Sequence, residues 1–173
     1  FLEAWARAKG LAFLRFDYTG HGASSGLFRD GCIGDWARDA ADALTHLTEG
    51  PQILVGSSMG GWIALLLAER LPGRMRGLVG IAAAPDFTED SMWANFTDDQ
   101  RRRLASEGAL PVPSDYSEEP YVITRRLIEE FTRAGRHGLR SGGQSGLALS
   151  GRRGRAAPVP AGLFAGEHAE PRA

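Results

Sequence analysis

The sequence has few residues of the kinds that build disulfide frameworks, zinc clusters or membrane spans. It contains one cysteine, Cys32, in 173 residues, which excludes an intramolecular disulfide and a thiolate metal cluster. It has a single lysine, and its formal net charge of −1 shows that the chain lacks the excess of basic residues typical of nucleic-acid-binding proteins. Its longest apolar runs, such as residues 62–68, are far shorter than the roughly 20 residues that cross a bilayer. We therefore expect no nucleic-acid partner and no membrane span.

The two ends of the chain differ from its middle. The chain begins with Phe1, inside a predicted helix, so we expect the fold to be truncated at the N-terminus. Residues 131–173 hold seven Arg and two Glu, whereas residues 1–130 carry a net charge of −6. Two interpretations of this anomalous Gly/Ala/Arg-rich tail stay open. One is intrinsic disorder. The other, which we favour, is a frameshift, because 19 arginines indicate GC-rich coding DNA. The lack of a visible export signal favours the bacterial cytoplasm.

The hydrophobic pattern predicts an α/β fold with a mostly parallel sheet. Short apolar runs predict strands buried on both faces at residues 11–16 and 52–56, and a third strand is predicted at 75–84. Apolar residues spaced by three and four predict helices at 1–9, 33–47 and 59–70. Alternation of these elements with short connections is typical of a parallel sheet covered by helices.

The pattern changes after Pro85. Further helices are predicted at residues 89–95, 98–107 and 121–131, separated by prolines. An insertion after the carboxyl end of a strand lies where open α/β sheets bind ligands. We therefore expect three parts: a partial core at 1–84, a helical lid at 85–130, and the tail at 131–173.

Polar residues on the helix predicted at 33–47 favour structural roles. Asp35, Asp39 and Asp42 are interpreted as a solvated face rather than a metal site. Cys32 is interpreted as an ordinary, half-buried residue, because nothing near it in sequence suggests a reactive thiolate.

The strongest chemical signal is the run Gly-Ser-Ser-Met-Gly at residues 56–60, which matches Gly-x-Ser-x-Gly. The motif is short enough to arise by chance, but a predicted strand precedes it and a predicted helix follows it. A tight turn between the two would expose the hydroxyl of Ser58 and aim the Met59 N–H at a developing oxyanion. The alternative is a glycine-rich turn that only joins strand to helix.

A serine hydroxyl needs a base, usually a histidine oriented by a carboxylate. In hydrolases with this turn the order along the chain is Ser, acid, His. His21 and His46 precede Ser58 and are interpreted as structural or surface residues, whereas His137 and His168 lie in the tail. No aspartate follows Asp115, so the acid and the histidine stay unidentified.

Three stretches, residues 16–26, 54–62 and 80–90, resemble the α/β-hydrolases. The resemblance is strongest to bacterial relatives of the mitochondrial palmitoyl-protein thioesterase, also described as mycophenolic acid acyl-glucuronide esterase, and covers about residues 1–130. It implies a serine hydrolase of small-molecule or protein-bound acyl esters and thioesters. Ser58 would be the nucleophile and Met59 a backbone oxyanion donor, with no cofactor and no metal.

The resemblance fails where the acid and the histidine of the family are expected, after the lid. Ala169 stands where an aspartate is expected, Glu170 is one place off, and no histidine follows. A second oxyanion donor would come from a loop before Phe1. Two alternatives therefore stay open: a catalytically inactive hydrolase-fold fragment, and a serine peptidase of the same fold. The oligomeric state is unknown from the sequence.

Overall fold

The computed structural model describes residues 1–113 and 120–129, and these fall into two compact units. Phe1–Asp17 belong to one unit, which contains helix α1 (Leu2–Ala8), as predicted. The other unit begins at Tyr18 and holds every strand of the described residues. The expectations for the tail at 131–173 lie outside the described residues, and the lid at 85–130 stays a prediction.

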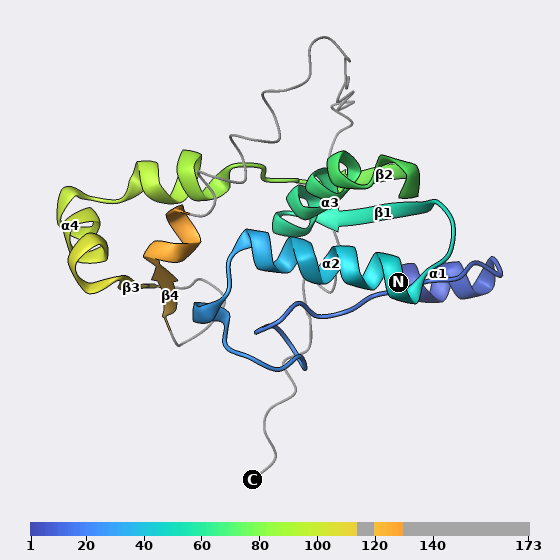
Figure 1. Cartoon of the computed structure of the whole chain (residues 1–173), viewed down its shortest axis with the longest axis horizontal. Helices are drawn as coiled ribbons and strands as arrows, with labels where there is room; N and C mark the ends of the chain where they lie inside the picture. Colours follow the sequence, from blue (N-terminus) through green and yellow to red (C-terminus); the bar gives the residue numbers. More distant parts are fainter. Residues whose placement is uncertain (114–119, 130–173) are drawn as a thin grey trace, which may run out of the picture. The chain divides into compact units, whose positions relative to one another are not determined.

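The second unit contains a two-stranded parallel sheet (Figure 1). β1 (Gln52–Ser57) pairs with β2 (Met75–Ile81), and helix α3 (Met59–Arg70) joins them and packs against both. Helix α2 (Ile33–Leu47) packs against α3. The bounds of both helices confirm the prediction, and β2 ends three residues earlier than predicted.

The strands of this sheet are less covered than predicted. Ile53 and Val55 of β1 are 63% and 46% exposed, and Val79 of β2 is 48% exposed. The prediction of a strand buried on both faces at residues 52–56 is therefore wrong for the described residues. Side chains alternate between the faces of a strand, and α3 covers only one face of β1 and β2.

The strand predicted at residues 11–16 is also wrong for the described residues, which form no strand there. Strands exist only where a neighbouring strand shares their backbone hydrogen bonds. The ladders among the described residues are β1–β2 and an antiparallel pair, β3 (Ala109–Val112) with β4 (Tyr121–Thr124). Leu11 and Phe13 are accordingly exposed.

The region after Pro85 contains the predicted helices only in part. A π-helical turn, η3 (Thr88–Trp93), and helix α4 (Asp98–Glu107) lie where helices were predicted. The helix predicted at 121–131 is wrong at its start, because β4 occupies residues 121–124 and helical turns begin at Arg125. Every residue of β4 is either aromatic or β-branched, and such residues favour a strand when a partner such as β3 is present.

One apolar core joins these elements. It contains the tryptophans of α2 and α3, together with buried side chains of α4, β3, β4 and the turn after β4. The chief members are Trp36, Trp62, Leu104, Leu110, Ile123 and Leu127. A short 3-10 helix, η1 (Phe28–Asp30), contacts β4, and a second, η2 (Pro72–Arg74), leads into β2.

Candidate functional site

Ser58 lies at the turn between β1 and α3, where the sequence placed it. Its φ of 49° and ψ of −120° are outside the regions that non-glycine residues ordinarily adopt. Such backbone strain costs on the order of 1–3 kcal/mol and persists only where the surrounding structure imposes it. Ser58 is exposed, although the helix after it contributes to the buried core and Leu54 of the strand before it packs against that core.

Two close backbone contacts make this turn tight. A Cβ atom on Gly56 would lie 2.2 Å from the carbonyl oxygen of Gly60, so only glycine fits there. A Cβ atom on Gly61 would lie 2.6 Å from the Cβ of Ala83, which follows β2. The start of α3 is therefore pressed against β1 on one side and against the end of β2 on the other.

Backbone hydrogen bonds hold the turn from both sides. The Ser58 N–H donates to the carbonyl of Ile81 at 3.0 Å, and the Ser58 carbonyl accepts from the Ala84 N–H at 3.3 Å. Ala82, which follows Ile81, also has a positive φ, of 46°. The strained conformation is thus fixed by the end of the neighbouring strand.

The Ser58 side chain does not cap the helix that it precedes. Serine at this position usually accepts a hydrogen bond from the first helical turn, but Ser58 makes no side-chain cap bond. Met59 is the first residue of α3, so its N–H has no acceptor within the helix. An exposed hydroxyl and a helix-terminal N–H therefore sit side by side, and the positive end of the helix favours negative charge there.

An aromatic loop lies next to the turn. The Tyr18 hydroxyl is 4.0 Å from the position that a Cβ atom on Gly60 would occupy. The Tyr18 ring packs edge-on against His21, with centroids 5.8 Å apart, and His21 packs edge-on against Trp36 at 4.8 Å. The indole N–H of Trp36 donates to the Thr19 carbonyl at 3.0 Å, which holds the loop on α2.

The Tyr18 phenol predicts a pH dependence of stability. Burial, and after it the charge of Asp39, raises the pKa of Tyr18 above its ordinary value of 10.0. The native state therefore binds this proton more tightly than the unfolded chain, so the stabilisation is complete below pH 10 and is lost as pH rises through the higher native pKa. Urea unfolding should show wild type losing stability above pH 10 more steeply than Tyr18→Phe. Parallel losses in the two proteins would contradict the assignment.

The other polar residues singled out in the sequence have structural contacts. His21 packs among aromatic rings and His46 is exposed, in agreement with their interpretation, whereas His137 and His168 lie outside the described residues. Cys32 is fully buried rather than half-buried, because its side chain packs in the core while its Sγ donates to Asp35 at 3.2 Å.

The prediction of a solvated acidic face on α2 is wrong for two of its three residues. Asp35 closes a capping box with Cys32 and forms an ion pair with Arg126 at 2.8 Å. Asp39 accepts the Thr19 N–H at 2.8 Å. Only Asp42 is exposed as predicted. Both corrected residues bind groups far away in sequence, which periodicity does not reveal. Among the described residues, no group of three or more His, Cys, Asp or Glu is arranged to hold a metal.

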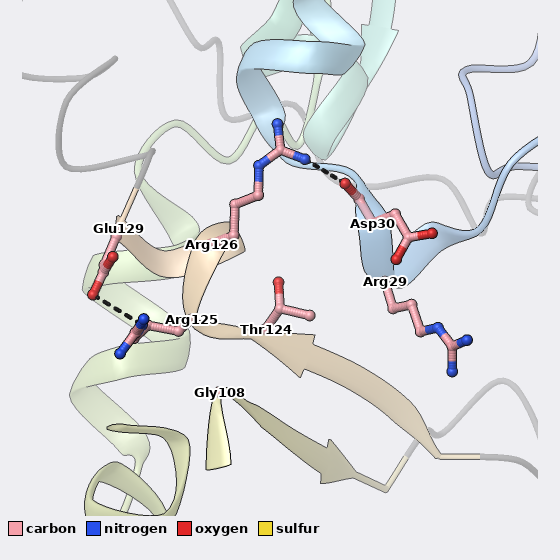
Figure 2. Close-up of a pocket in the computed structure, with 7 residues that line it drawn as sticks. All are labelled: Arg29, Asp30, Gly108, Thr124, Arg125, Arg126 and Glu129. Carbon is pink, nitrogen blue, oxygen red and sulfur yellow. Dashed lines mark hydrogen bonds and ion pairs between the residues drawn. The ribbon is translucent and has the colours of Figure 1, made fainter. Parts of the chain in front are cut away.

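Ser58 lines neither of two cavities whose walls are formed by described residues of the unit that begins at Tyr18. One, of about 620 Å³, opens between η1 and the end of β4 (Figure 2). The other, of about 270 Å³, opens between the loop after Tyr18 and α2, and Asp30 lines both. No local pattern in the sequence indicates either cavity, because each gathers residues from segments far apart in the chain.

The chain is similar to known hydrolases over most of its described length. A family model described as the alpha/beta hydrolase fold matches residues 2–127. The mitochondrial palmitoyl-protein thioesterase ABHD10 of Bos taurus is 37% identical over 130 residues, which are 75% of this chain and 42% of that protein.

Two solved structures share the fold. A candidate hydrolase from Agrobacterium vitis S4 matches with a TM-score of 0.72 and 42% identity, over 77% of this chain and 53% of that one. The alpha/beta hydrolase domain-containing protein 10 from mouse matches with a TM-score of 0.66 and 34% identity, over the same shares. The chain thus spans about two-fifths of its curated relative and about half of the two solved chains. No helix among the described residues is long and apolar enough to cross a membrane.

Proposed function

The chain belongs to the α/β-hydrolase fold family, and we propose that it carries the nucleophile of a serine hydrolase. In this proposal Ser58 Oγ attacks the carbonyl carbon of an ester or thioester and expels the alcohol or thiol. The resulting acyl-enzyme is then hydrolysed by water. The Met59 N–H donates a hydrogen bond to the oxyanion that forms in each step.

One observation carries this proposal: the Ser58 side chain is exposed at a strained turn and is not used to cap its helix. A turn that merely joined β1 to α3 would not need a serine at a φ of 49°, since glycine adopts that conformation without strain. A role in the reaction would explain why a strained serine stands here, because this conformation presents the hydroxyl beside an N–H donor. Strained residues cluster at active sites for this reason.

The substrate class rests on the relatives. The curated relatives from Bos taurus and Homo sapiens are named palmitoyl-protein thioesterases, and their 37% and 36% identity over 130 residues supports ester or thioester hydrolysis in general. We propose acyl esters and thioesters, small or protein-bound, as the substrates. The base and the acid that would act with Ser58 are not identified among the described residues. A peptidase activity and a cytoplasmic location stay predictions.

A fluorophosphonate probe tests whether Ser58 is a nucleophile. The serine oxygen displaces fluoride at phosphorus and becomes covalently phosphonylated, so the intact chain should gain one probe mass. Peptide mass spectrometry should place the adduct on Ser58. Ser58→Ala should abolish labelling, whereas Ser57→Ala, the matched control at the exposed neighbouring serine, should label as wild type does.

The same experiment decides between the enzyme and the inactive fragment. A folded chain that stays unlabelled after long exposure to the probe would contradict the nucleophile and favour the inactive fragment. Labelling that survives in Ser58→Ala would place the reactive group elsewhere. Circular dichroism of each variant establishes that the chain under test is folded.

A further inference from the structure

The larger cavity has a lining that suits an anion and has no part in the proposed hydrolysis. Its walls come from η1, from Gly108 at the end of α4, and from the carboxyl end of β4 with the turn after it. The lining residues are Arg29, Asp30, Gly108, Thr124, Arg125, Arg126 and Glu129. Its volume of about 620 Å³ lies within the range of small-molecule sites. From this lining we infer that the cavity binds a small molecule through a phosphate or carboxylate group.

The three guanidinium groups of the cavity are engaged to different degrees. Arg126 is occupied, because it pairs with Asp35 at 2.8 Å and donates to the Asp30 carbonyl. Arg125 is partly engaged, since its Nε lies 3.4 Å from Glu129 and one terminal nitrogen is 3.5 Å from the Ala105 carbonyl. Arg29 makes no ion pair or hydrogen bond with its side chain within residues 1–113 and 120–129.

Arg29 and Arg125 therefore keep N–H donors for a ligand. Guanidinium groups bind phosphate and carboxylate through paired, charge-assisted hydrogen bonds. Figure 2 shows Arg125 and Arg29 on opposite sides of Thr124, whose hydroxyl points toward the turn that carries Arg126. The Thr124 oxygen accepts the Leu127 N–H at 3.1 Å, so its hydroxyl hydrogen stays available to donate to an anion.

The two carboxylates of the lining differ in whether their charge is paired, and an unpaired negative charge would weaken anion binding. Glu129 is paired with Arg125, whereas Asp30 has no ion pair among the described residues. The Asp30 side chain projects from η1 next to Arg29 in Figure 2 and lines the same cavity. Its charge opposes an anion bound there, so removing that charge should strengthen anion binding. A merely structural role for Asp30 predicts no such gain.

Titration of the whole chain with inorganic phosphate tests the site. Isothermal calorimetry at constant ionic strength, set with sodium chloride, should show one saturable site, and a parallel titration with succinate distinguishes a preference for phosphate from one for carboxylate. Arg29→Gln should weaken binding by about tenfold, the equivalent of one charge-assisted hydrogen bond. Asp30→Asn should strengthen it by about threefold.

Two further variants separate this site from general charge and from hydrolysis. Arg102→Gln removes an exposed arginine of α4 that pairs with Asp99 and does not line the cavity, so binding should be unchanged. Ser58→Ala should also bind as wild type does, whatever its labelling. Absence of saturable binding of both anions would overturn the inference. An equal loss in Arg29→Gln and Arg102→Gln, or weaker binding in Asp30→Asn, would overturn it as well.

Discussion

Replacing Gly56 by alanine is expected to destabilise the fold by on the order of 3 kcal/mol and to abolish labelling of Ser58. The added Cβ would meet three backbone atoms, at 2.2 Å from Gly60 O, 2.4 Å from Gly60 C and 2.6 Å from Gly61 N. Backbone atoms have no alternative rotamer, so relief requires the start of α3 to move away from β1. That movement would also change the position of Ser58 and of the Met59 N–H.

A matched glycine on the neighbouring strand provides the control. A Cβ on Gly77 of β2 would meet only the Ile53 side chain, at an ordinary contact distance of 3.8 Å. Gly77→Ala should therefore be neutral or stabilise the protein by up to about 1 kcal/mol, since alanine restricts the unfolded chain. Urea unfolding and probe labelling of both variants check the prediction. Equal stability of Gly56→Ala and Gly77→Ala would show that the turn is looser than its geometry indicates.

The turn at Ser58 could be predicted from the sequence because its glycines belong to a local motif. Gly56 and Gly60 stand in a motif whose neighbours already predict a strand and a helix, so close approach and strain follow from local pattern. The bounds of α2 were predicted for a similar reason, because Ile33, Trp36 and Leu44 recur at helical spacing and bury one face. Local patterns identified the elements that position Ser58.

The remaining features depend on contacts that no local pattern encodes. Periodicity alone does not distinguish a strand from a buried helix at residues 121–124, and pairing with β3 decides for the strand. The ion pair of Arg126 with Asp35 joins residues far apart in the chain, and so does the cavity between η1 and β4. Such contacts arise from packing of the whole unit, so sequence reasoning missed both.

Replacing Trp36 by alanine is expected to cost about 3–5 kcal/mol, a large fraction of the 5–15 kcal/mol that stabilises a typical domain. Trp36 is 1% exposed and stacks on Phe28 with ring centroids 5.4 Å apart. Its indole N–H also donates to the Thr19 carbonyl, so the alanine variant leaves a cavity and removes one hydrogen bond to that carbonyl. The loop that carries Tyr18 should therefore lose its contacts with the Trp36 side chain, while the bond from the Thr19 N–H to Asp39 of α2 remains.

Two tryptophan variants divide this cost into its parts. Trp36→Phe keeps an aromatic ring in the core but loses the bond to Thr19, and it should cost less than the alanine variant by at least about 1 kcal/mol. Trp5→Ala, at a tryptophan of α1 that is 49% exposed, should change stability by less than about 1 kcal/mol. Urea unfolding followed by far-UV circular dichroism measures all three without relying on tryptophan fluorescence. A Trp36→Ala variant as stable as Trp5→Ala would mean that the aromatic cluster around His21 does not anchor the loop beside Ser58.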